Sequence, residues 1–129
     1  MLKQITMAAV LALVLCGCGP DIYQLNEIDN GKTIRCSKGD QLVITLPANP
    51  TTGYSWQVYR QPSSEHLVLT KSIFNEVKGN RRMVGLPGTY SFFYTVTGPG
   101  KEGISLIYSR SWEDKAPAGR FEMLVDATE

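Results

Sequence analysis

The side chains best suited to covalent or acid–base chemistry are few in this sequence and lie far apart along it. His66 is the single histidine of the 129 residues, and Cys36 is its one conceivable partner in a nucleophile–base pair. Cys36 belongs to an alternating run in which a small buried side chain is expected, and His66 opens the apolar run HLVLT. We therefore predict that the chain is not an enzyme. A small hydrolase that uses Cys36 is the alternative.

Metal and cofactor sites are not expected either. A zinc site needs several protein ligands, and one histidine with one free thiol cannot supply them without a group of carboxylates. The acidic residues are scattered, and the adjacent pair Glu113 and Asp114 lies in a Lys-, Pro- and Gly-containing segment that we interpret as a solvated loop. The 13 basic residues against 12 acidic ones leave a net charge of only +1, which gives no basis for binding nucleic acid through its phosphates.

The beginning of the chain has the layout of an export signal. Lys3 is followed by an apolar stretch over residues 5–15, which is too short to span a bilayer because a spanning helix takes about 20 residues. Next comes Leu-Cys-Gly-Cys at residues 15–18. This sequence resembles the lipobox of bacterial lipoproteins, in which an aliphatic residue and then a small residue precede the cysteine that becomes acylated.

The lipobox resemblance implies that residues 1–17 are removed as a signal peptide and that Cys18, with residues 18–21, forms the lipidated end and a short tether. Two or more acyl chains are enough for stable anchoring. Gly19 follows the cysteine at the position where an aspartate would signal retention in the inner membrane, so this position resembles that of lipoproteins sorted to the outer membrane. The implied location is the bacterial cell envelope, at the outer membrane, facing the periplasm or the cell surface. An ordinary signal peptide, or an N-terminal anchor that is retained, is the alternative. Residues 22–129 must then fold without an internal disulfide.

The rest of the sequence predicts strands and turns, and no window predicts a helix. Runs rich in β-branched and aromatic residues, bounded by Gly, Pro, Asn or Asp, occur at residues 41–46, 55–60, 89–97, 103–110 and 120–125. Weaker strands are predicted at residues 33–36, 66–69 and 72–77. About seven or eight strands in one domain favour an all-β fold, an immunoglobulin-like antiparallel β-sandwich.

The most informative turn is NPTTGYSW, residues 49–56. Pro50 restricts its own φ and holds Asn49 extended. Gly53 permits a positive φ where the chain leaves the turn. These restrictions predict a stiff loop, which loses less entropy when it binds a partner.

Two pairs of residues define the apex and the base of this loop. Thr51 and Thr52 place two small hydroxyl side chains at the apex. Tyr54 and Trp56 are two residues apart and lie on one face of the next strand, where they pin the loop to the core. The alternative is an ordinary connecting turn followed by the core tryptophan of a sandwich.

NPTTGYSW resembles the hallmark loop of the chagasin family, which comprises immunoglobulin-like inhibitors of papain-like cysteine peptidases. Residues 84–92, VGLPGTYSF, are similar to the family's second loop, a Gly-rich turn followed by a strand with an aromatic residue. Arg110-Ser111-Trp112 is similar to the third loop, which is usually Arg-Pro-Trp. Ser111 replaces that proline, and Leu86-Pro87 replaces small residues, so the third loop is expected to be more mobile and the second stiffer.

The resemblance implies a reversible inhibitor whose three loops, at residues 49–53, 84–88 and 110–112, block the active-site cleft. The first loop would lie over the catalytic cysteine and histidine and offer threonine hydroxyls as donors. The second would use its backbone, and the third would supply the aromatic area of Trp112 and the charge of Arg110. The implied peptidase-binding residues are Asn49, Pro50, Thr51, Thr52, Gly53, Val84, Gly85, Leu86, Pro87, Gly88, Arg110 and Trp112.

The second and third loops also have ordinary interpretations. Residues 85–88 fit a plain hairpin, Trp112 fits a core or strand-end aromatic, and Arg110 fits a solvated charge. The alternative function is a structural or adhesive lipoprotein of the cell envelope without inhibitory activity. We expect a monomer whose partners are a papain-like cysteine peptidase and, through Cys18, a membrane.

Overall fold

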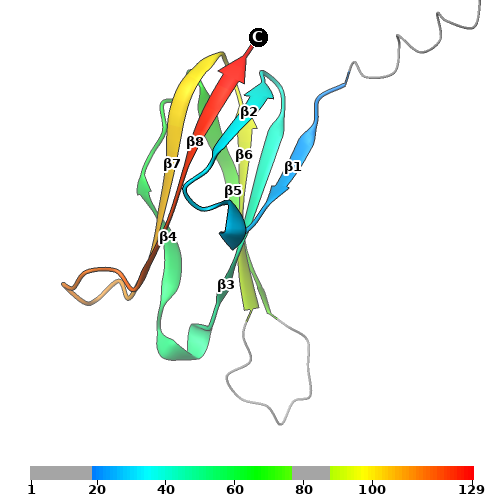
Figure 1. Ribbon diagram of the computed structural model, residues 1–129. Helices are drawn as coiled ribbons and strands as arrows, with labels where there is room; N and C mark the ends of the chain where they lie inside the picture. The colour runs from blue at the N-terminus through cyan, green and yellow to red at the C-terminus, as the bar shows by residue number, and fades with distance from the viewer. Residues whose placement is uncertain (1–18, 77–87) are drawn as a thin grey trace, which may run out of the picture.

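Two four-stranded β-sheets pack face to face in the computed structural model, which describes residues 19–76 and 88–129 (Figure 1). The strands are β1 (Ile22–Leu25), β2 (Thr33–Ser37), β3 (Gln41–Ala48), β4 (Ser55–Arg60), β5 (Leu67–Glu76), β6 (Gly88–Val96), β7 (Gly100–Ser109) and β8 (Gly119–Thr128). One sheet has the order β1-β3-β6-β5 and the other β2-β8-β7-β4. The predicted all-β sandwich is confirmed.

Two of the strand pairs are parallel, whereas only antiparallel pairs were expected. β1 runs parallel to β3, and β2 runs parallel to β8. The remaining neighbours, β3–β6, β5–β6, β4–β7 and β7–β8, are antiparallel. The difference arises because β1 and β2 belong to different sheets, so each joins an edge of its sheet without forming a hairpin with its neighbour.

The core lies between the two sheets and is built from alternating residues, as the period of two predicts. Leu42, Ile44 and Leu46 of β3 are almost fully buried. Phe92, Tyr94 and Val96 of β6 point into the same layer, opposite the inward side chains of β7 and β8. Cys36 is one of these core side chains.

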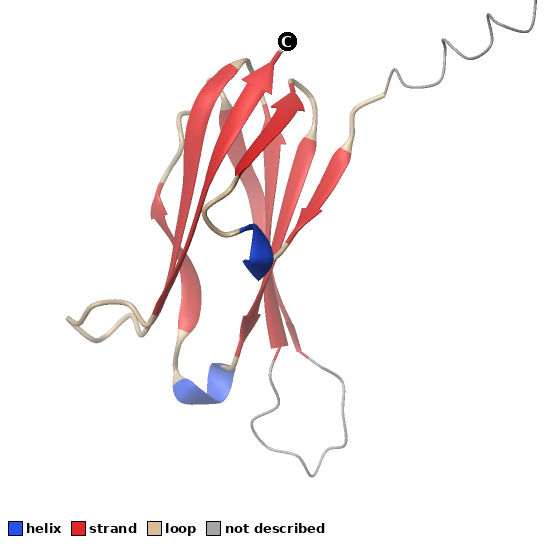
Figure 2. Cartoon of the chain, viewed as in Figure 1, coloured by secondary structure: helices blue, strands red, loops and turns tan. Residues whose placement is uncertain are grey.

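Helical structure in the described residues is limited to two short 3-10 turns, η2 (Glu27–Asp29) and η3 (Pro50–Thr52) (Figure 2). None of the described helices has the length and apolar character needed to cross a membrane. β5 is a single strand where two short ones were expected. A register shift between Leu69 and Lys71 interrupts its alternation, which is why the sequence suggested a break.

Strand register brings the ends of β3, β5 and β7 to one end of the sandwich, which we call the loop end. Ala48 pairs with Gly88, and Gly88 pairs with Glu76, so β3, β5 and β6 all meet this end together. Ser55 pairs with Ser109, which places residues 49–54 beside residues 110–118. In Figure 1 residues 49–54 lie at the bottom of the view and residues 110–118 at its lower left.

The N-terminal segment enters at the opposite end of the sandwich. Ile22 pairs with Gln41, the first residue of β3, which is the residue farthest along that strand from the loop end. The buried carboxylate of Asp40 accepts hydrogen bonds from the backbone N–H groups of Asp21 (2.9 Å) and Ser37 (2.8 Å). The chain is therefore fixed to the domain from Asp21 onward. β1 was not predicted, since a run of only four residues gives a weak pattern in the sequence; in the structure Ile22 and Gln24 are exposed and Leu25 is buried.

Candidate functional site

Loop 49–53 is held by hydrogen bonds that converge on Asn49. The Asn49 carboxamide oxygen accepts from the Thr51 backbone N–H (3.1 Å) and the Thr51 hydroxyl (2.7 Å). The Asn49 carbonyl accepts from the Thr52 backbone N–H (3.3 Å) and the Thr52 hydroxyl (2.7 Å). Gly53 follows with a φ of 84°, which completes the exit from the turn. These four hydrogen bonds to Asn49 restrain the loop, in agreement with the stiffness predicted from Pro50 and Gly53.

This network also changes the role that the two threonines were expected to have. Thr51 and Thr52 are exposed at the apex, as expected. Each hydroxyl hydrogen, however, is directed back into the loop toward Asn49. In the free loop both threonine hydroxyl hydrogens are therefore engaged within the loop, so the donors that the family resemblance implies already have partners.

The base of the loop is an aromatic cluster centred on Tyr108 of β7. Its ring stacks on Tyr54 with the centroids 5.3 Å apart, and Trp56 packs against it at 5.1 Å. Its hydroxyl accepts a hydrogen bond from the Asn49 backbone N–H at 3.1 Å. Trp56 adds a hydrogen bond from its indole N–H to the carbonyl of Pro47 at 2.9 Å. Tyr54 and Trp56 do pin the loop, as predicted, but through Tyr108, which sequence analysis did not single out.

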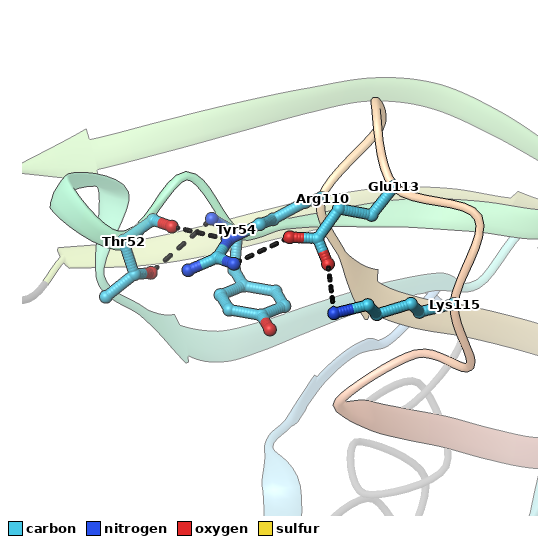
Figure 3. Close-up of polar contacts among 5 residues, drawn as sticks. All are labelled: Thr52, Tyr54, Arg110, Glu113 and Lys115. Atoms are coloured by element: carbon cyan, nitrogen blue, oxygen red, sulfur yellow. Dashed lines mark hydrogen bonds and ion pairs between the residues drawn. The ribbon is translucent and has the colours of Figure 1, made fainter.

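Arg110 joins this loop to the third one (Figure 3). Its Nε donates to the carbonyl of Thr52 at 2.9 Å, and its guanidinium carbon lies 4.4 Å from the centroid of the Tyr54 ring. Its Nη1 donates to Oε1 of Glu113 at 2.6 Å. Arg110 is thus not a freely solvated charge, because its Nε, its Nη1 and the face of its guanidinium group each contact another residue of the domain.

The hydrogen bond between Arg110 and Glu113 shifts the pKa of both side chains. The hydrogen bond from Arg110 lowers the pKa of Glu113 below its usual 4.5. The same bond raises the pKa of Arg110. The prediction that Glu113 is a solvated charge is therefore wrong, because no local sequence pattern marks a carboxylate that pairs with the residue three positions earlier in a turn.

Trp112 is exposed over 70% of its surface and is not a core residue. Its ring edge lies against Gly53: a Cβ placed on Gly53 would be 2.5 Å from Trp112 Cη2 and 3.0 Å from Cζ2. The first and third loops therefore touch at Gly53–Trp112 as well as at Thr52–Arg110. Together, residues 49–53 and 110–113 form one continuous surface, which we call the two-loop surface.

Most of the second loop cannot be compared with its prediction. Val84, Gly85, Leu86 and Pro87 lie outside the described residues. Gly88 is buried as the first residue of β6, and a Cβ there would lie 2.5 Å from the carbonyl oxygen of Asn75. Gly88 is therefore packed too tightly for any side chain, and the backbone contact with the peptidase expected at this residue stays a prediction.

The groups considered for catalysis do not form a reactive site. Burial raises the pKa of the Cys36 thiol, which disfavours the thiolate that a nucleophile needs. His66 lies ahead of β5 and packs against Gly100. Within residues 19–76 and 88–129, no three His, Cys, Asp or Glu side chains gather in an arrangement that could hold a metal ion.

Comparison with known proteins agrees with this geometry. The family model described as chagasin family peptidase inhibitor I42 matches residues 35–125. Amoebiasin-1 of Entamoeba histolytica is 35% identical over 102 residues, covering 79% of this chain and 96% of that protein. Chagasin of Trypanosoma cruzi is 28% identical over 94 residues, covering 70% of this chain and 83% of that protein.

A solved structure shows the same fold. The crystal structure of the cysteine protease inhibitor EhICP2 from Entamoeba histolytica superposes with a TM-score of 0.74 and 28% sequence identity, covering 83% of this chain and 96% of that one. The matched region of the family model includes the first and third loops and most of both sheets. This chain belongs to the chagasin family of peptidase inhibitors.

Proposed function

We propose that this chain is a reversible inhibitor of papain-like cysteine peptidases and that its loop end blocks the active-site cleft. The observation that carries the proposal is the two-loop surface, in which an exposed indole and an exposed threonine apex are fixed to each other before any partner arrives. A preformed surface loses little conformational entropy on binding. Membership of an inhibitor family supplies the target class.

The conformation of loop 49–53 supports inhibition without cleavage. Residues 50–52 form a 3-10 turn, and the Asn49 carbonyl already accepts two hydrogen bonds. A carbonyl held in this way is not free to enter an oxyanion site, and the turn does not offer the extended backbone of a cleavable segment. The target's thiolate and imidazolium would face the apex of the loop, where the oxygens of Thr51 and Thr52 retain lone pairs for hydrogen bonds from the imidazolium.

Titration of the purified domain, residues 19–129, into active papain tests this function. Stoichiometric, reversible loss of hydrolysis of a fluorogenic peptide is the expected result. No effect on papain or related peptidases would favour the structural or adhesive alternative. Turnover of a substrate by the domain alone, lost in Cys36→Ala, would favour the hydrolase.

We further propose that the chain is anchored to a bacterial envelope membrane through an acylated Cys18. The lipobox-like residues 15–18 support this. The attachment of Asp21 to Asp40 leaves residues 18–20 as the whole tether, at the end of the domain opposite the loops. An anchor at this position would hold the two-loop surface away from the bilayer, where a soluble peptidase can reach it.

Two measurements test the anchor. Cys18→Ser should release the protein from the membrane fraction or leave the signal segment uncleaved, and a cleaved Cys18→Ser protein that stays in the membrane would contradict the proposal. Both tryptophans, Trp56 and Trp112, are close to the loop end. Brominated lipids should therefore leave the fluorescence of the anchored protein unquenched, and strong quenching would show that the loop end faces the bilayer.

A further inference from the structure

Glu113 lies in the β7–β8 connection and contacts Arg110 twice. Its Oε1 accepts from Arg110 Nη1 at 2.6 Å, and its backbone N–H donates to the Arg110 carbonyl at 3.2 Å. The second contact closes a turn over residues 110–113, which brings the carboxylate to the guanidinium. The Glu113 side chain is only 21% exposed, so the pair is less accessible to water than an ordinary surface ion pair.

Arg110 in turn crosses to the first loop. Nε donates to the carbonyl of Thr52, 58 residues away in the sequence, and the guanidinium plane covers Tyr54. These contacts require the guanidinium to keep one orientation, since Nε, Nη1 and the flat face are each used at once. Glu113 is the one anion bonded to Arg110 among the described residues, and it fixes that orientation.

We infer that Glu113 is a positioning residue for inhibition: it holds Arg110 across the base of the loop end, so that loops 49–53 and 110–112 are presented as one preformed surface. This inference rests on the proposed function. It assigns Arg110 an internal role in place of the direct charge contact with the peptidase that the family resemblance implies. Lys115 contributes little to the position of Glu113, because its Nζ is 3.9 Å from Glu113 Oε2 and its side chain is highly exposed.

The two roles for Arg110 predict opposite effects of removing Glu113. If Arg110 bound an acidic group of the peptidase, Glu113→Gln would free its charge and strengthen inhibition. If Glu113 positions Arg110, Glu113→Gln weakens the contact that fixes the loops, and inhibition falls. Glu113→Ala removes the contact altogether and should weaken inhibition further. Arg110→Lys keeps the charge but cannot make the three contacts together, so it should also lose inhibition.

The experiment measures inhibition of papain by the wild-type domain, Glu113→Gln, Glu113→Ala and Arg110→Lys. Asp114→Asn is the matched control, because it removes the same charge from the adjacent exposed position. We expect the inhibition constant to rise about 3- to 10-fold for Glu113→Gln and about 10-fold or more for Glu113→Ala, as for loss of a charge-assisted hydrogen bond. Asp114→Asn should stay within about 2-fold of wild type.

Amide hydrogen exchange of the free proteins provides a second readout that does not depend on any peptidase. Faster exchange at Thr52, Gly53 and Tyr54 in Glu113→Gln, with protection of the sheet amides unchanged, is expected for a loosened loop. Unchanged or stronger inhibition by Glu113→Gln would overturn the inference, whatever the exchange shows. If the wild-type domain inhibits no papain-like peptidase, the proposed function fails, and unchanged exchange in Glu113→Gln would then show separately that Glu113 does not order the loops.

Discussion

The indole of Trp112 lies against the α-carbon of Gly53, so closely that a Cβ on Gly53 would approach Cη2 to 2.5 Å. Gly53 also has a φ of 84°, a conformation that L side chains rarely adopt. One glycine therefore meets two requirements at once. It lets the chain leave the first loop, and it provides the surface on which the third loop rests.

Gly53→Ala should therefore weaken inhibition strongly. The positive φ costs about 1–2 kcal/mol for a residue with a Cβ, and the methyl group would displace Trp112. Gly31→Ala is the matched control: Gly31 has the same φ of 84°, but a Cβ there has no atom within 4 Å. Inhibition constants and melting temperatures of both variants separate the two effects. We expect both to lose stability and only Gly53→Ala to lose inhibition, and equal inhibition by the two would contradict the Gly53–Trp112 contact as a functional feature.

Trp112→Ala should affect binding much more than folding. The side chain is 70% exposed, so little apolar burial is lost in the free domain. In the complex its burial is expected to contribute on the order of 2–4 kcal/mol, or roughly 30- to 1000-fold in the inhibition constant. Tyr59→Ala is a suitable control, since Tyr59 is an exposed aromatic of β4 outside the two-loop surface. A normal inhibition constant for Trp112→Ala would exclude Trp112 as a binding residue.

The hydroxyl of Thr52 should matter through the loop's internal bonds. It donates to the Asn49 carbonyl at 2.7 Å and accepts from the Tyr54 backbone N–H at 3.4 Å. Thr52→Val removes these bonds and should weaken inhibition by about 0.5–1.5 kcal/mol, mainly in the off-rate. Thr52→Ser keeps the hydroxyl and should inhibit nearly as well as wild type. Surface plasmon resonance against an inactivated papain gives the association and dissociation rates. Equal losses of affinity for Thr52→Val and Thr52→Ser would show that the hydroxyl is not responsible for the effect.

The Arg110–Glu113 pair should persist in mildly acidic solution. The folded pKa of Glu113 is lowered below 4.5 by the hydrogen bond from Arg110, so its stabilising contribution is fully present above that value and is lost as the pH falls through the folded pKa. The Nε–H resonance of Arg110 should be constant from pH 7 to 5 and should shift only below 4.5. In Glu113→Gln this titration should be absent. A midpoint above 4.5 in the wild type would mean that the pair is not formed in solution.

Tyr94 provides a prediction about stability alone. Its side chain is almost fully buried in the core, its hydroxyl has no hydrogen-bond partner among the described residues, and burial raises its pKa to about 12. An unpaired buried hydroxyl costs about 1–3 kcal/mol. Tyr94→Phe should therefore leave the free energy of unfolding unchanged or raise it by about 1 kcal/mol. A clear loss of stability in urea unfolding would reveal a partner for the hydroxyl.

The roles of some functional residues could not be predicted from the sequence, because their contacts join distant parts of the chain. Tyr108 lies in the strand predicted at residues 103–110, where nothing in the sequence distinguishes it, yet it is the centre of the aromatic base of the first loop. Glu113 looked like a solvated charge, yet it pairs with Arg110. Neither role has a local pattern, because each depends on which strand ends lie side by side.

Features that depend on neighbours along the chain could be predicted from the order of the amino acids. Alternation of apolar residues specified most strands of the sandwich, and Pro50 with Gly53 specified a stiff first loop, since restrictions on φ act within one or two residues. Tertiary structure alone decided that the threonine hydroxyls turn inward, that Trp112 rests on Gly53, and that Arg110 reaches Thr52. These contacts could not be predicted because strand pairing, and not local propensity, places residues 49–54 beside residues 110–113.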